Sequence, residues 1–159
     1  MRQRRPITGI LFIFVGIIAT IYGSIVLKNA SASSAWPSVQ GEVTESKVEK
    51  KVKRVKRDGR FETKTTFLAN VQYSYSVDGT PYSGGKVSFG DYGGEQKHAR
   101  EIVGRYPKGK AVDVYYDPEK PEMAVLEPGA TRSSYLILGI GLVALIGGIA
   151  AYFGMGRSH

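Results

Sequence analysis

Four carboxylates and three prolines lie within sixteen residues near the end of the chain, in the segment VYYDPEKPEMAVLEPG, residues 114–129. Carboxylates at such spacing can bind a cation or serve as an acid and base pair. A calcium loop also needs oxygen ligands at alternating positions and a glycine at its bend, which this segment does not show. Aspartate and proline favour a turn, because aspartate caps the backbone two residues on and proline fixes φ at about −65°. The segment therefore predicts a turn at Asp117-Pro118 and no metal site.

The segment GTPYSGGKVSFG, residues 79–90, comes near the sequence of a phosphate-binding loop. Its Gly-Lys pair stands one residue too late, and Val87 occupies the position where a serine or threonine must reach Mg²⁺. Ser83 and Lys86 match a nucleophile-and-base pattern, but an extended strand directs them to opposite faces. His98 has no second ligand one helical turn away, and the chain has no cysteine. We expect a strand with glycines at a bulge, no catalytic residue, no metal, no cofactor and no enzymatic activity.

A strongly basic stretch, residues 47–64, is the feature with the clearest potential for binding. Its candidate contact residues are Lys50, Lys51, Lys53, Arg54, Lys56, Arg57 and Arg60. One interpretation is a solvated hairpin whose edges are protected by charge. The other is attraction to anionic lipid head groups or to an acidic envelope protein, at about 1 kcal/mol for each basic residue near an anionic surface. Few aromatic side chains accompany these charges, so we expect no nucleic acid.

The two ends of the chain are apolar, and they determine where the central segment lies. Residues 7–27 and 135–153 contain no charged side chain, and at about 1.5 Å per residue each reaches the thickness of a bilayer's hydrocarbon core. We predict transmembrane helices over 1–28 and 134–154. The basic N-terminus and the triplet at 30–32 resemble a cleaved signal peptide, but the apolar run is about twice the usual length. We therefore expect an uncleaved anchor.

Charged residues beside the two apolar segments predict the orientation. Arg2, Arg4 and Arg5 precede the first segment and Arg157 follows the second, whereas only Lys28 and Arg132 flank the other side. Because basic flanks stay in the cytoplasm, we expect a multi-pass protein of the bacterial inner membrane with cytoplasmic termini. The central domain would then be periplasmic or extracellular.

Small residues recur along both apolar segments. The predicted packing positions are Gly16, Thr20 and Gly23 in the first segment and Gly141, Ala144, Gly148 and Ala151 in the second. Such stripes let two helices approach closely in lipid, where no hydrophobic drive exists. We expect the stripes to face each other within one chain, or a neighbouring copy in an oligomer.

Between the helices, residues 36–128 predict a small α+β domain with the element order β-β-β-α-β-β. The stretch KNASASSA, residues 28–35, is predicted to be a flexible tether. Asp58-Gly59 and Asp78-Gly79 favour type I′ hairpin turns. A two-residue turn at Asp58-Gly59 would place Val43 on the wrong face, so we expect a bulge between Val43 and Val55.

One short helix interrupts the strands of this domain. Ala99, Ile102, Val103 and Tyr106 form an apolar stripe at helical spacing, and Pro107 with Gly109 ends it. The predicted fold class is therefore a membrane protein with two transmembrane helices flanking an antiparallel sheet and one short helix.

Several motifs resemble a widespread bacterial membrane family of unknown function. They are Trp36-Pro37 with Gly41-Glu42-Val43, the segment 73–79 with Tyr82, Arg105-Tyr106-Pro107, and Val114-Tyr115-Tyr116-Asp117-Pro118 with Pro121. The resemblance implies two helices around a small β-rich domain and transfers no catalytic residue.

The sequence as a whole favours a membrane-anchored, non-enzymatic binding or accessory module of the bacterial envelope. Its expected partners are the bilayer and an anionic head group or acidic envelope protein. Two alternatives remain open: a structural subunit of a larger membrane complex, and an envelope hydrolase.

Overall fold

The computed structural model describes residues 6–57, 60–91 and 93–154. Two long helices flank a five-stranded sheet and one short helix, in the predicted order. The elements are α1 (Pro6–Ser33), β1 (Ser38–Arg57), β2 (Arg60–Val77), β3 (Thr80–Gly84), α2 (Gln96–Arg105), β4 (Ala111–Asp117), β5 (Lys120–Val125) and α3 (Arg132–Gly154).

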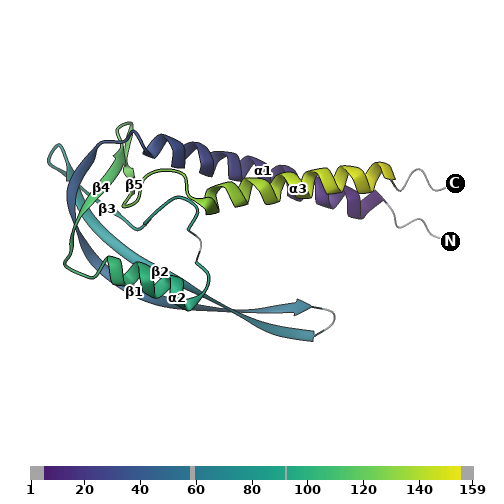
Figure 1. Ribbon diagram of the computed structural model, residues 1–159, viewed down its shortest axis with the longest axis horizontal. Coiled ribbons are helices and arrows are strands. Elements are labelled where there is room, and N and C mark those ends of the chain that lie inside the picture. Colours follow the sequence, from purple (N-terminus) through teal and green to yellow (C-terminus); the bar gives the residue numbers. More distant parts are fainter. Residues whose placement is uncertain (1–5, 58–59, 92, 155–159) are drawn as a thin grey trace.

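The sheet is antiparallel, with the strand order β3-β2-β1-β4-β5 (Figure 1). β1 and β2 are 20 and 18 residues long, far more than the common strand length of about 5–6 residues. Only one end of this hairpin belongs to the five-stranded sheet. The other end leaves the sheet as a two-stranded ribbon.

The strand register follows the predicted turns and bulge. Arg57 pairs with Arg60, and the register shifts by one residue between Val43 and Glu45. The shift returns Val43 to the face of Tyr73, as the alternation of apolar residues requires. Residues 78 and 79 of the second turn have φ values of 50° and 81°, as a type I′ turn needs. The first predicted turn, at 58–59, lies outside the described residues.

The domain core lies between one face of the sheet and α2. Its fully buried side chains include Val43, Val71, Tyr73, Ile102 and Val114. The Tyr73 hydroxyl lies 2.9 Å from the carbonyl oxygens of Lys86 and Ala124, and burial raises the pKa of Tyr73. Tyr73 thus joins β2 to β5 and to the loop after β3.

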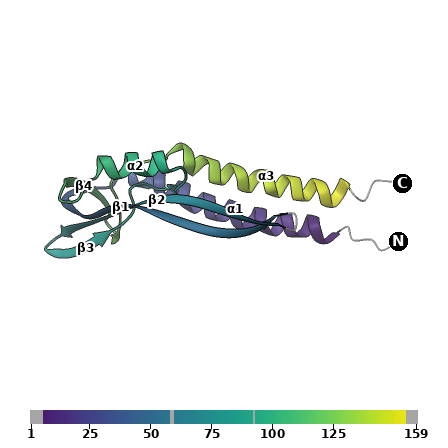
Figure 2. The ribbon, with the colours of Figure 1, turned by 90° about the horizontal axis from the view of Figure 1, so that it is seen from below.

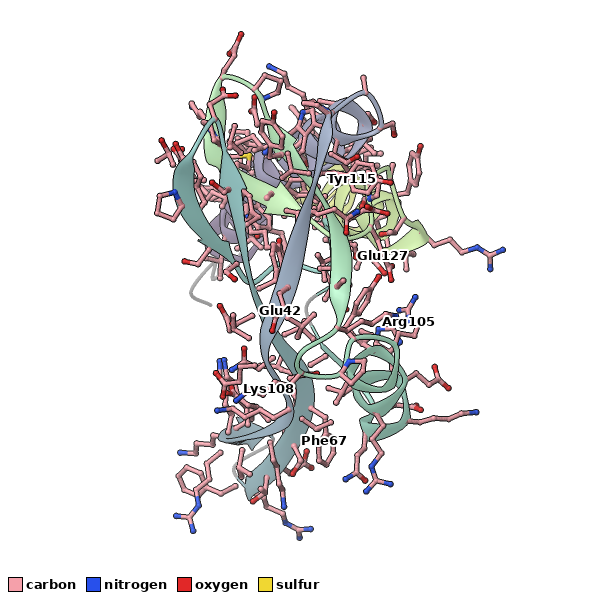
Figure 3. The ribbon with its side chains drawn as sticks, turned by 90° about the vertical axis from the view of Figure 1, so that its left-hand side faces the viewer. Glu42, Phe67, Arg105, Lys108, Tyr115 and Glu127 are labelled. Atoms are coloured by element: carbon pink, nitrogen blue, oxygen red, sulfur yellow. The ribbon has the colours of Figure 1, made fainter. Side chains whose placement is uncertain are left out.

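Carboxylates of the acidic segment at the end of the domain make structural contacts. The Asp117 carboxylate accepts a hydrogen bond of 2.9 Å from the Glu119 backbone N–H, which confirms the predicted turn. Glu127 is held by Arg105 at 2.6 Å and by the Tyr106 hydroxyl at 2.9 Å, and Figure 3 shows Arg105 and Glu127 side by side near α2. Burial and this hydrogen bond raise the pKa of Tyr106 to about 12. These contacts anchor α2 to the segment after β5.

The predicted tether at 28–35 is wrong, because α1 continues through Ser33. Ala30 and Ser33 are completely buried. Ala30 packs in a second apolar cluster with Phe89 and Val125, and the Ser33 hydroxyl accepts a 2.8 Å hydrogen bond from the Gly129 N–H. Tertiary contacts therefore extend a helix that its small polar composition does not favour.

The strand expected to continue beyond Gly84 also ends earlier, since β3 stops at that residue. Phe89 then packs edge-to-face against Trp36, with 5.8 Å between ring centroids. The Ser134 hydroxyl donates to the Phe89 carbonyl oxygen at 2.9 Å. The loop after β3 leaves the sheet because Phe89 is buried at the base of the long helices.

The two long helices are apolar and largely exposed. Gly9–Ser33 and Arg132–Phe153 have mean hydropathies of 2.6 and 2.4, and only 17 % and 11 % of their apolar windows are buried. A core helix of a water-soluble domain would bury much more of such a surface. Both helices are therefore long and apolar enough to cross a membrane.

Candidate functional site

The basic stretch forms the free end of the β1–β2 hairpin, and we refer to residues 47–64 as the arm. Nine basic and three acidic residues give it a net charge of +6, most of the chain's +8. All the described basic residues of the arm are exposed, and the side chain of Arg57 is not described. The arm is thus a concentrated positive surface on a strand pair that contributes little to the core.

Among the described residues of the arm, ion pairs neutralise charge only at its base. Lys47 lies 2.5 Å from Glu45 and 3.7 Å from Glu49. The hydrogen bond that the Lys47 ammonium donates to the Glu45 carboxylate raises the pKa of Lys47. Within the described residues, no ion pair involves the basic residues between Lys50 and Lys64. Their charge is available to an external partner.

Alternation along the strands divides these residues between two faces of the arm. The outer face, which continues the face of the domain core, carries Lys50, Arg54 and Lys56. Lys56 lies 5.9 Å from the ring centre of Phe61, within cation–π range, and Lys50 pairs across the strands with Phe67. Each outer cation therefore has a neutral neighbour.

The inner face carries Lys51, Lys53, Arg60 and Lys64. Lys53 is paired directly with Lys64, and Lys51 with Thr66. Like charges at directly paired positions are destabilising. The three lysines line a hollow of about 510 Å³, which also includes Leu68 and Asp91. The inner face thus combines an unfavourable concentration of charge with space for an anion.

The arm and the long helices leave the sheet in the same direction. In Figure 1 the helix pair runs above the arm, with a wide space between the two, and in Figure 2 the arm and α1 extend to the same side of the sheet. The loop that holds Phe89 against α1 and α3 fixes the helix pair to the domain. Any surface that surrounds the helices near their domain end will therefore face the arm.

The small residues of the helices lie where α1 and α3 meet. A Cβ added to Gly16 would come within 2.5 Å of the Leu145 backbone nitrogen, and one on Gly23 within 2.8 Å of Leu138. Gly141 and Gly148 make the same close approach to Thr20 and to the residues around Ile13.

These approaches repeat regularly along the helix pair. Seven residues forward on α1 always correspond to seven residues back on α3, as in an antiparallel pair with a heptad repeat. Ala144 and Ala151 are half-buried. The Thr20 hydroxyl donates to the Gly16 carbonyl oxygen at 2.7 Å, within its own helix. The glycines thus set the distance between the helices.

Two lysines of the site were not among the candidates from the sequence. Lys64 pairs with Lys53, a position that the predicted turn register already implied. Lys86 lies in the loop after β3 and lines a hollow against α1, with its ammonium 5.4 Å from the Phe89 ring centre. No local signal identified Lys86, because its position depends on where the loop folds.

These features define a class: a small antiparallel α+β domain carried on a hairpin of two apolar helices, with a basic arm beside them. The chain belongs to the family described as Domain of unknown function (DUF3592), whose model matches residues 39–131, more than half of the chain. This confirms the resemblance predicted from the sequence. A comparison with curated proteins found no match.

Proposed function

We propose that this chain is a membrane-anchored, non-enzymatic binding module, in which the helix pair spans a bacterial inner membrane and the arm binds its anionic surface. The main observation in support of this proposal is that the arm and the helix pair extend from the sheet in the same direction. A bilayer around the helices places its head groups next to the densest positive charge of the molecule.

The length of α1 supports this arrangement. Its 25-residue apolar span extends about 37 Å, longer than the hydrocarbon core of about 30 Å. The last turns of α1, which include Lys28, therefore stand among the head groups. Lysine and arginine cannot enter hydrocarbon cheaply, so the proposal requires the arm to bend away from the direction of the helix pair and to lie along the bilayer surface.

The side chains of the arm suit such a surface. Phe61 is 74 % exposed beside Lys56, and Val52 is 54 % exposed between basic neighbours. Aromatic rings and long basic side chains favour the interface between water and lipid. With about 1 kcal/mol per basic residue, seven such residues supply a strong and salt-sensitive attraction.

A fluorescent label on the arm tests the proposal, because the chain has no cysteine of its own. Thr63→Cys carrying an environment-sensitive dye is expected to shift to shorter wavelength in nanodiscs containing phosphatidylglycerol, compared with phosphatidylcholine alone. High salt should reverse the shift, as should glutamine at Lys50, Lys51, Lys53, Arg54, Lys56, Arg57 and Arg60. A label at Thr80→Cys, at the start of β3 and beside the opposite end of β2, is the control and should not respond. Equal emission from the arm in both lipids would contradict the proposal.

The proposed orientation places both termini in the cytoplasm and the domain on the other side. The antiparallel packing of α1 and α3 supports termini on one side, and the basic flanks support the cytoplasm. Protease added to spheroplasts is expected to cleave the domain at the exposed arm and leave N- and C-terminal tags intact. Cleavage of the tags with protection of the domain would reverse the orientation.

A further inference from the structure

A groove leads from the inner face of the arm, along the loop after β3, to α1. It consists of three hollows that share lining residues. The hollow under the arm contains Leu68 and Asp91, and a small second hollow contains both of these with Lys86 and Ser88. A third hollow of about 210 Å³ contains Lys86, Ser88 and Asp91 together with residues of α1. We call the three together the arm–helix groove.

The two ends of the groove differ in chemistry. At the helix end its wall is Tyr22, Ile25 and Val26 of α1, with Asn29 one turn further on. At the arm end its wall is Lys51, Lys53 and Lys64 with Thr66. A ligand that matches both ends has an apolar part and a negatively charged polar part.

Among the described residues that line the groove, Asp91 is the one acidic residue, and its carboxylate is already engaged. The Asp91 carboxylate lies 3.5 Å from the His98 imidazole and accepts a hydrogen bond from the Gly93 N–H at 3.2 Å. Glu62, also on the inner face, does not line the hollow. Lys86 lies between the two ends of the groove, so positive charge predominates along its length.

We propose that the arm–helix groove binds one anionic phospholipid, with its acyl chains against α1 and its phosphate-bearing head group beneath Lys51, Lys53 and Lys64. The inference rests on the proposed membrane function and makes it specific. If the arm is attracted to the anionic bilayer surface in general, every basic residue of the arm contributes about equally to binding. If one lipid binds in a specific site, the inner face contributes most to binding, because its paired lysines repel each other until an anion lies between them.

Two variants of equal charge separate these possibilities. The inner variant carries Lys51→Gln, Lys53→Gln and Lys64→Gln, and the outer variant carries Lys50→Gln, Arg54→Gln and Lys56→Gln. Each removes three positive charges from exposed positions of the same hairpin. Both variants should retain the circular dichroism spectrum and unfolding temperature of the parent chain in neutral detergent.

Binding is measured by native mass spectrometry of the full chain in neutral detergent, titrated with phosphatidylglycerol. The inner variant is expected to bind at least about tenfold more weakly than the parent chain, and the outer variant within about threefold of it. Equal weakening in both variants would overturn the groove and leave the proposed function of the arm intact. No weakening in either would overturn both.

A second titration identifies the source of the phosphate. The soluble head group glycerophosphoglycerol lacks the acyl chains that would lie against Tyr22 and Ile25. It is expected to bind at least about tenfold more weakly than the intact lipid. Equal affinity for both compounds would exclude a lipid as the occupant of the groove.

Discussion

Replacing Gly16 with leucine is expected to force α1 and α3 apart and to destabilise the helix pair by more than about 3 kcal/mol. A Cβ alone would lie 2.5 Å from the Leu145 nitrogen and 2.7 Å from its Cα, where only backbone movement can relieve the contact. Leucine adds three more carbon atoms in the same direction. Gly148→Leu, whose Cβ would lie 2.8 Å from the Ile13 nitrogen, is expected to have a similar effect.

The single tryptophan provides the measurement for this prediction. Trp36 packs against Phe89 at the base of the helices, so its fluorescence reports whether the helices still hold the domain. The unfolding temperature in mild detergent is expected to fall sharply for both variants. Gly139→Leu and Gly147→Leu are matched controls on α3, because nothing lies within 4 Å of an added Cβ at either position. Equal stability of Gly16→Leu and Gly139→Leu would show that this packing does not stabilise the pair.

Replacing Tyr73 with alanine is expected to destabilise the domain by about 3–5 kcal/mol, the usual cost of removing a large buried aromatic side chain. Tyr73 is completely buried, and its hydroxyl reaches the carbonyl oxygens of Lys86 and Ala124. The substitution empties the centre of the core and leaves both carbonyls without this partner. Tyr73→Phe should cost about 1 kcal/mol, since it removes the hydroxyl and keeps the ring.

Urea unfolding of the full chain, followed by far-ultraviolet circular dichroism at wavelengths dominated by the sheet, measures these differences. Phe61→Ala is the matched control, because Phe61 is 74 % exposed on the arm. Its effect on the free energy of unfolding should stay within about 0.5 kcal/mol. The order of stability should be Phe61→Ala, then Tyr73→Phe, then Tyr73→Ala. A Tyr73→Ala chain as stable as Phe61→Ala would place the core elsewhere.

The loss of Tyr73 is also expected to reach the groove. Its ring lies against Gly84, and its hydroxyl contacts the Lys86 carbonyl, at the start of the loop that lines two of the hollows. Tyr73 therefore holds the backbone of Lys86, a residue that lines the groove. Tyr73→Phe is therefore expected to bind phosphatidylglycerol more weakly in the same titration, and unchanged binding would contradict this link.

Local patterns in the sequence determine the elements of this protein and much of their pairing. Alternating Val71, Tyr73 and Tyr75 predict a half-buried strand, and the two Asp-Gly pairs predict the register of both hairpins. The bulge near Val43 follows from that register, because a shift of one residue reverses the faces of a strand. The helical stripe of Ala99 and Ile102 likewise predicts which side of α2 is buried. Each of these relations acts over a few residues or across one turn.

Tertiary contacts decide the parts that join these elements. The end of α1 is helical because Ala30 and Ser33 are buried against residues almost a hundred positions away, although their composition predicts a tether. β3 is short because Phe89 is buried at the helix base. The groove arises in the same way, since the loop brings Lys86 to α1 while the long hairpin carries Lys53 and Lys64 alongside. The sequence alone determined the charge of the arm and the apolar character of the helices. Only long-range packing determined that the two point in the same direction.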